Sequence, residues 1–374
     1  MRVVTAIALL SFLCVLSLCS ISAEDTCKSQ HSLCGIAVYF NPASYQQKKN
    51  NWKRFRRSSK EQGLFLIAVE LLFGNNTEEL TEGTDCDALI QIRSNSGDSK
   101  LWQKERLLNV GLSAVTETIC SNIAWLDGEV LLTNHNWVKE TVSSLQIYPV
   151  VQVFSYAIKL PKNVMWLNPY STRISNAKVE GVRTTGIAHI VAVKGIRVMV
   201  KGDHLGHTGY GWAGRTSLFK NLTFYDYAVV GGADTLMAHA FYENYYKSKP
   251  GRNVPAYYLT RFKGTAGPQV AHFHIWAKRA FELIGGKVGF ISGTLSHIWH
   301  GSNSDRIYES RHRFLRDLDP AIVLSKETCN IIYLSSTLLD ITESCFIWAW
   351  KSQVTPSSVQ LQVNSMFHTR KEDG

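Results

Sequence analysis

One stretch of the chain constrains its fold more than any other. Residues 101–137 read as an amphipathic helix, a short loop, an apolar run from Asn122 to Leu126, and two acids, Asp127 and Glu129, on either side of a glycine. In open α/β sheets, ligands bind at the carboxyl ends of the strands. Two carboxylates there can hold a divalent cation, which in turn holds phosphate oxygens. The stretch predicts such a sheet with a metal–diphosphate site, although an isolated Asp-x-Glu after a strand is more often a solvated turn.

The chain around this stretch alternates between strand and helix patterns. Residues 35–40 and 64–73 are apolar runs typical of buried strands, and a basic amphipathic helix to about residue 60 separates them. This order predicts a doubly wound α/β sheet. Strand-like runs at 150–156, 196–200 and 288–291 and a helical run at 235–246 continue the pattern. The polar end, 367–374, reads as a frayed tail without a role.

The helix before the acidic strand carries a resemblance to a known family. Residues 106–111 read RLLNVG. The stretch resembles glycosyltransferases of the GT-A fold, and most nearly the β-1,4-galactosyltransferase type, in which KLLNVG precedes a strand ending in Asp-x-Asp. Glu129 stands here where that family has its second Asp. The resemblance spans most of residues 35–320 and is most specific at 104–129. It implies a GT-A-like fold with a doubly wound mixed sheet. It also implies an enzyme that transfers a hexose from a nucleotide sugar, expected to be UDP-linked.

That resemblance, together with the apolar N-terminal run described below, predicts a division of the chain. Residues 1–23 would be a signal peptide or signal anchor and 24–130 the nucleotide-sugar-binding half. Residues 131–325 would be the metal- and acceptor-binding half of the same domain, and 326–374 a C-terminal extension.

Two histidines in the sequence HIWHG, His297 and His300, are candidate metal ligands. Such a pair alone is more often part of a core or a surface. The galactosyltransferases, however, place a Met and a His at the same spacing as metal ligands. Imidazole nitrogen suits a transition ion such as Mn²⁺ better than Mg²⁺. We therefore expect Asp127, Glu129, His297 and His300 to bind one Mn²⁺.

A candidate catalytic base follows a glycine turn. Asp234 ends the sequence GGAD, and the related enzymes carry Gly-Gly-Glu-Asp there, preceded by a Gly-Trp that here lies apart at Gly211-Trp212. Asp234 would deprotonate the acceptor hydroxyl; the alternative is a helix N-cap. Tyr210 and Trp212 would stack on a sugar, or pack in the core as Trp residues more often do. The expected nucleotide-binding residues are Asn41, Glu70, Arg106 and Asp127, and the expected substrate-binding residues are Tyr210, Trp212, Gly231 and Gly232.

The N-terminus and the cysteines indicate a secretory chain. Residues 3–23 are uncharged and end in small residues, which favours a cleaved signal peptide over a membrane anchor. Six cysteines follow it without a Cys-x-x-Cys pair, so zinc is not expected and disulfides are. Asn75 and Asn221 begin glycosylation sequons. We expect local disulfide pairs Cys27–Cys34 and Cys329–Cys345, and a location in the secretory lumen or outside the cell, with membrane contact only if residues 3–23 stay attached.

Positive charge is concentrated near the N-terminus. The net charge is +10, and seven Lys or Arg residues lie between Lys48 and Lys60. Such a run is usually the solvated face of a helix. A secreted chain rarely meets nucleic acid, so nucleic acid is not an expected partner; an anionic nucleotide sugar or an acidic glycan would use the same field.

Three functions fit these patterns. The first is a metal-dependent glycosyltransferase with a nucleotide-sugar donor and a glycan or glycoconjugate acceptor. The second is a non-catalytic, lectin-like relative with the same fold, favoured by Glu129 and the altered GGAD loop. The third is a secreted nucleotide-binding protein or phosphohydrolase with a similar sheet.

Overall fold

The computed structural model describes residues 30–162, 164, 183–196, 206–242, 268–302, 305 and 318–373. The expected signal segment, Cys27 and most of the strand-like run 196–200 lie outside these ranges. Within them, no helix combines the length and the apolar character needed to cross a membrane.

Four parallel strands form the centre of the main sheet, in the order β3-β2-β1-β4. This is the strand order of a doubly wound fold. β1 lies between β2 and β4, so its carboxyl end is at the middle of the edge where ligands are expected. The bounds of these strands are Cys34–Phe40 for β1, Phe65–Phe73 for β2, Ala88–Ser94 for β3 and Asn122–Leu126 for β4.

Further strands make the sheet mixed. Beyond β4 the order continues β10-β6-β11, with β10 antiparallel to both neighbours, and β14 is antiparallel to β3 at the other edge. The predicted fold class, α/β with a doubly wound mixed sheet, is confirmed. These strands span Gly211–Arg215 (β10), Val150–Gln152 (β6), Val288–Phe290 (β11) and Asn330–Leu334 (β14).

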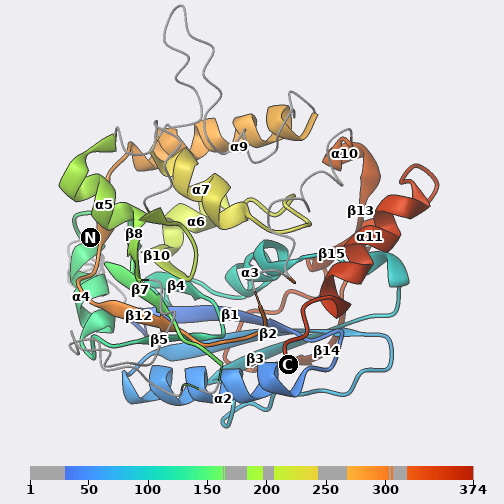
Figure 1. Cartoon of the computed structure of the whole chain (residues 1–374), viewed down its shortest axis with the longest axis horizontal. Coiled ribbons are helices and arrows are strands. Elements are labelled where there is room, and N and C mark those ends of the chain that lie inside the picture. Colours follow the sequence, from blue (N-terminus) through green and yellow to red (C-terminus); the bar gives the residue numbers. More distant parts are fainter. Residues whose placement is uncertain are drawn as a thin grey trace, which may run out of the picture.

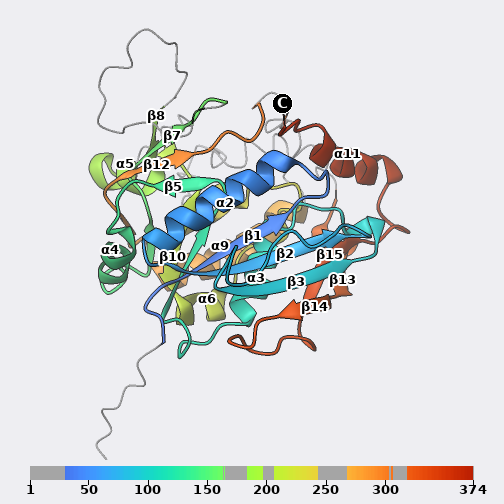
Figure 2. The same cartoon turned by 90° about the horizontal axis from the view of Figure 1, so that it is seen from below.

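Helices cover both faces of the main sheet (Figures 1 and 2). Side chains of β1 alternate between the faces: Ile36 packs in one cluster with Leu107 and Leu108 of α3, and Ala37 packs in another with Trp52 of α2. Burial of each large apolar side chain contributes about 1.5–3 kcal/mol. α2 (Gln46–Glu61) covers one face, and the other is covered by α3 (Lys104–Ser113), α6 (Thr216–Leu222), α7 (Ala233–Phe241) and α9 (Pro268–Ile284).

A second sheet, ordered β5-β12-β7-β8-β9, joins segments that are far apart in the sequence. At one edge of this sheet β5 pairs antiparallel with β12, which sets Val130 opposite His297. The strands span Val130–Leu132 (β5), Thr294–His297 (β12), Tyr156–Lys159 (β7), Arg183–Gly186 (β8) and Gly206–His207 (β9), with α4 (Trp137–Ser144) and α5 (Ile187–Lys194) between them in the chain.

The C-terminal part is more ordered than its sequence predicted. It forms an antiparallel ribbon of β13 (Leu324–Thr328) and β15 (Phe346–Trp350), preceded by α10 (Pro320–Val323) and followed by α11 (Ser357–His368). The expectation of a frayed tail is wrong, because residues up to Asp373 dock on α2. The β3 strand and the short helix η1 (Gly97–Ser99) lie between the runs at 64–73 and 101–137, in a stretch for which no element was predicted.

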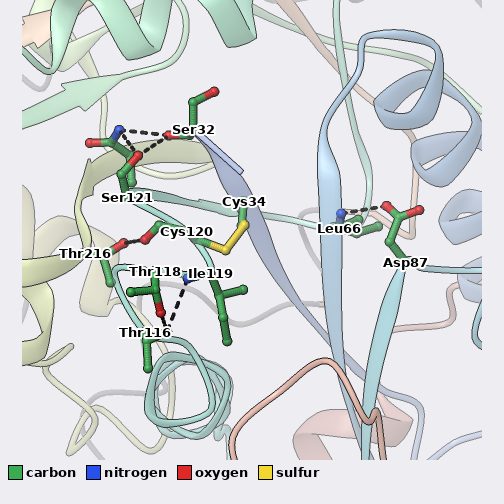
Figure 3. The surroundings of a disulfide bond; sticks show 11 residues. Ser32, Cys34, Leu66, Asp87, Thr116, Thr118, Ile119, Cys120, Ser121 and Thr216 are labelled. Atoms are coloured by element: carbon green, nitrogen blue, oxygen red, sulfur yellow. Dashed lines mark hydrogen bonds between the residues drawn. A yellow bond between two sulfur atoms is a disulfide. The ribbon is translucent and has the colours of Figure 1, made fainter. Parts of the chain in front are cut away.

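The disulfides differ in part from the expected pairs. Cys34 bonds Cys120 (Figure 3), so the predicted pair Cys27–Cys34 is wrong. The predicted pair Cys329–Cys345 is confirmed. The reason is the pairing of β1 with β4, which sets Cys34 opposite Ile123 and brings the Cα atoms of Cys34 and Cys120 to 5.8 Å. The Thr216 hydroxyl donates to the carbonyl of Cys120 at 2.7 Å and fixes α6 to the same corner. Among the described cysteines, Cys86 is a buried free thiol.

Candidate functional site

The end of β4 sets the two acids at the carboxyl edge of the main sheet. The Asp127 amide donates to the carbonyl of Tyr210 at 2.9 Å, which continues the pairing of β4 with β10. A Cβ atom at Gly128 would lie 2.7 Å from Cε3 of Trp52. Glycine is therefore required between the acids because α2 packs its largest buried side chain against that backbone.

Lys104, which the sequence analysis did not single out, bridges two acids of the site. Its Nζ lies 2.6 Å from Asp127 Oδ1 and 3.2 Å from Asp234 Oδ1, and only 6% of the residue is exposed. Burial by itself would lower the pKa of Lys104, but the carboxylates of Asp127 and Asp234 outweigh it and hold that pKa well above its usual value. A lysine in the first turn of a helix opposes the helix dipole. That conflict, at the edge of an acidic strand, is the signal that could have revealed Lys104.

Glu129 faces a different pair of partners. Its Oε1 lies 3.6 Å from Nζ of Lys48 and 3.9 Å from Nδ1 of His300. The main chain explains the proximity: β5 pairs with β12, and the Ile298 amide donates to the Glu129 carbonyl at 2.8 Å. The structure thus brings together one acid and one histidine that the sequence proposed as ligands of a common ion. Lys48, expected on a solvated helix face, instead lies beside them.

The aromatic residues of the region form a stacked column. The Tyr210 ring stacks on His207 with centroids 3.7 Å apart and on His297 at 4.5 Å, and the ring of His297 meets that of His300 at 4.6 Å. Two rings stacked so closely on Tyr210 must lie on its opposite faces. The expectation that a sugar stacks on Tyr210 is therefore not supported, because both faces are covered.

Trp212 is also placed differently from the expectation. It is 2% exposed, its ring packs against Phe241, and its Nε1 donates to the Thr208 carbonyl at 2.8 Å. The cause is the alternation of β10, which directs this side chain to the face covered by α7. Trp212 belongs to the core and offers no face to a sugar.

The expected four-ligand metal site is only partly assembled. In the described part of the chain, no three His, Cys, Asp or Glu side chains converge closely enough to hold an ion. Glu129 and His300 form a close pair, whereas Asp127 is held toward Asp234 by Lys104. The carboxylate and imidazole of Glu129 and His300 are a donor set that fits Mn²⁺, with the remaining ligands left to a diphosphate.

Asn41 and Glu70, two of the expected nucleotide-binding residues, have structural roles. The Asn41 side chain bonds the carbonyl and the amide of Tyr45 and also Oε1 of Glu79. Glu70 accepts hydrogen bonds from the amide of Glu79 at 2.9 Å and from Nε2 of Gln91 at 2.7 Å. Burial raises the pKa of Glu70, and these donors oppose the rise. Both side chains anchor the loop at Glu79, and Glu70 lies opposite Tyr39, within its strand and not at its carboxyl end.

Arg106 has a structural partner as well. Its Nη1 lies 2.9 Å from Oδ2 of Asp226, which also accepts from Nδ2 of Asn109 at 3.1 Å. Burial lowers the pKa of Arg106, and the Asp226 carboxylate counteracts the fall. The conspicuous motif RLLNVG therefore holds the segment after α6, and its Gly111 lets α3 approach β1, since a Cβ there would meet Ile36 at 2.7 Å.

Asp234 lies at the start of α7, facing Lys104. Gly231 and Gly232 have φ values of 85° and 92°, a left-handed turn that favours glycine. Gly232 is the N-cap, so the alternative of Asp234 as N-cap is not what the structure shows. A Cβ at Gly209 would lie 3.4 Å from Oδ2 of Asp234. The glycine turn and Gly209 allow the backbone to approach this carboxylate closely.

Glu105 provides a pH test of the buried charges. Burial raises its pKa to about 8, with the Lys104 ammonium opposing the rise and the Asp234 carboxylate adding to it. The folded protein thus keeps a proton that the unfolded chain releases near pH 4.3, so stability falls as pH rises from about 4.5 to 8. We expect Glu105→Gln to remove this loss. Between pH 5 and pH 8.5, the free energy of unfolding of the variant should therefore rise by roughly 3 kcal/mol relative to that of the unaltered protein.

Urea denaturation at the two pH values measures this difference. Glu282→Gln is the matched control, because Glu282 pairs with Lys278 at 3.9 Å on the exposed face of α9. An equal effect of Glu105→Gln at both pH values would show that Glu105 is ionised in the folded protein throughout.

Comparisons with known proteins give remote likenesses only. No family model and no curated protein sequence matches the chain. Among solved structures, a glucosyl-3-phosphoglycerate synthase from Mycobacterium tuberculosis in complex with Mn²⁺, UDP and phosphoglyceric acid is similar, with a TM-score of 0.34 and 11% identity over 83% of this chain and 89% of that chain. A 4-diphosphocytidyl-2C-methyl-D-erythritol synthase from Anaerococcus prevotii has a TM-score of 0.29 and 10% identity, covering 70% of this chain and 89% of that chain.

Proposed function

We propose that the protein is a glycosyltransferase of the secretory pathway that transfers a hexose from a nucleotide sugar, UDP-linked, to a hydroxyl of a glycan or glycoconjugate. The observation that carries the proposal is the meeting of Glu129 and His300, 3.9 Å apart, beside the end of β4, the strand that Asp127 directly follows. A doubly wound sheet binds its ligand at this edge. The sequence likeness of residues 104–129 to the β-1,4-galactosyltransferase type supports the same function, and the disulfides suit a lumenal or secreted chain.

In this proposal Glu129 and His300 hold a divalent ion, with Asp127 and His297 next to them. When bound, the ion would neutralise charge that develops on the departing diphosphate. Lys48 and Lys104 add positive charge at the same edge, which favours an anionic ligand. Asp234 is the proposed base: it would take the proton of the acceptor hydroxyl once Lys104 turns toward the diphosphate.

A non-catalytic, lectin-like relative is the second candidate. The observation that favours it is the internal neutralisation of the site, because Lys104 bonds both Asp127 and Asp234 and Lys48 faces Glu129. A protein with these pairs as permanent features would bind a glycan without processing a nucleotide sugar.

Calorimetric titration separates the two candidates. For the transferase we expect UDP to bind in the presence of Mn²⁺ and binding to weaken with a chelator, together with hydrolysis of a UDP-hexose that depends on Mn²⁺. Glycan binding without any binding of UDP or Mn²⁺ would establish the lectin-like candidate and remove the transferase.

A further inference from the structure

The last two residues of α11 and the segment that follows them cross the carboxyl edge of the main sheet. We call these residues, 367–373, the C-terminal strap. In Figures 1 and 2 the C-terminal end lies beside one end of α2. The contacts identify that end as the helix N-terminus: the amides of Gln46 and Gln47 donate to the two carboxylate oxygens of Asp373, at 3.1 and 2.7 Å.

These bonds serve a helix that has no cap of its own. The N-cap residue of α2, Tyr45, makes no side-chain capping bond, and the first turn contains no acid. The first amides of a helix need acceptors, and its N-terminus favours negative charge. Asp373 supplies both needs from the far end of the sequence. The Tyr45 hydroxyl adds to the attachment, because it bonds the carbonyls of Phe367 and His368 and accepts the amide of Lys371.

Two buried side chains attach the strap on its inner side. The guanidinium of Arg370, 5% exposed, lies 4.4 Å from the ring centroid of Trp102, and the Phe367 ring meets that of Phe40 at 6.0 Å. Phe40 is the last residue of β1. The Arg370 carbonyl packs directly over Gly301, where a Cβ atom would collide with it.

The positions of these contacts define what the strap covers. Trp102 is two residues before Lys104, which bonds Asp127. Gln47 precedes Lys48 and Gly301 follows His300; Lys48 and His300 both lie beside the Glu129 carboxylate. The strap therefore touches residues one or two positions away from Lys104, Lys48 and His300, and these three side chains contact the two acids that follow β4.

We propose that the C-terminal strap is an autoinhibitory closure of the nucleotide-sugar site, and that the nucleotide binds only after the strap has left α2 and Trp102. The inference rests on the proposed function. The strap presents a carboxylate and a guanidinium at the edge where an anionic nucleotide would bind. Closure reduces the apparent affinity for the nucleotide to the fraction of molecules in which the edge is open, so release of the strap raises that affinity.

The first experiment measures UDP affinity, with Mn²⁺ present, by calorimetry. The double variant Arg370→Ala/Asp373→Ala removes the contacts with Trp102 and with the α2 amides. We expect UDP to bind this variant about tenfold more tightly than the unaltered protein, because closure no longer competes. Lys371→Ala is the matched control, since that side chain is exposed on the same strap, and it should leave the affinity unchanged.

The second experiment uses the unaltered protein and so does not depend on the folding of a variant. Trypsin can cut after Lys371 only when the strap has left α2 and Trp102, and mass spectrometry identifies the product. We expect saturating UDP with Mn²⁺ to accelerate this cleavage at least tenfold, because ligand binding selects the open state.

The outcomes are distinct. Tighter binding by the double variant, with faster cleavage in UDP, supports the closure. Equal UDP affinity in both proteins, or cleavage that UDP leaves unchanged or slows, contradicts the proposed closure while the proposed function stands. If UDP binds neither protein, the proposed function fails and the closure fails with it.

Discussion

Replacing Lys104 with methionine should lower the free energy of unfolding by about 3 kcal/mol at pH 7, because it leaves acids of the site without their shared cation. Nζ of Lys104 lies 2.6 Å from Asp127 and 3.2 Å from Asp234, and the side chain is nearly buried. Methionine keeps most of the volume, so the loss reports the charge. Urea denaturation monitored by circular dichroism measures it.

The pH dependence of this loss follows from the direction of the pKa shift. The pKa of Lys104 is raised by its carboxylates, so its contribution is fully present below the unfolded value near 10.4 and is lost only as pH rises through the folded value. The deficit of Lys104→Met should therefore stay constant from about pH 6 to 7 and grow as pH rises through about 8, because the Lys104 ammonium also lowers the pKa of Glu105.

Lys278→Met is the control for Lys104→Met. Lys278 pairs with Glu282 at 3.9 Å, one turn away on α9, and its side chain is 70% exposed. Exposed pairs of this kind contribute about 0.3–0.5 kcal/mol. A Lys104→Met variant as stable as Lys278→Met would mean that Asp127 and Asp234 are well solvated and do not need Lys104.

The largest effect on activity should come from Asp234 and Glu129, and the two variants should fail at different steps. Asp234→Asn removes the proposed proton acceptor, so transfer should fall by about a hundred- to ten-thousandfold while UDP and Mn²⁺ still bind. Glu129→Gln removes the charge of an ion ligand, so Mn²⁺ binding should weaken by at least about tenfold and transfer should fall with it. His300→Ala should behave like Glu129→Gln.

A transfer assay paired with calorimetry of UDP and Mn²⁺ distinguishes these steps. Asp340→Asn is the control acid, because Asp340 is fully exposed and bonds only its neighbour Thr342 among the hydrogen bonds seen. Undiminished transfer by Asp234→Asn would leave Asp234 as a partner of Lys104 alone. Mn²⁺ binding that is unaltered in both Glu129→Gln and His300→Ala would remove the proposed ion site.

The sequence by itself determined the elements whose patterns are local. The apolar run at 122–126 is β4 with the expected bounds, and the runs at 35–40 and 64–73 are β1 and β2, within one residue. Buried parallel strands are short apolar runs bounded by polar residues, so their existence and the location of Asp127 and Glu129 can be inferred without knowing their neighbours. The Cys329–Cys345 bond was inferred for the same reason, because its partners are close in the chain.

Only the tertiary structure decided which side chains meet. Pairing of β1 with β4 joined Cys34 to Cys120, and pairing of β5 with β12 brought His300 to Glu129. The meeting of Lys104 with Asp234 and the docking of the C-terminal strap could not be inferred, since Asp234 lies 130 residues from Lys104 and the strap lies at the opposite end of the chain from α2. Trp212 shows the converse. Its residue type suits sugar binding, but β10 directs the side chain to a covered face of the sheet, where it is buried. Local periodicity fixes the element, but strand register and helix packing fix the contacts, because these depend on the rest of the chain.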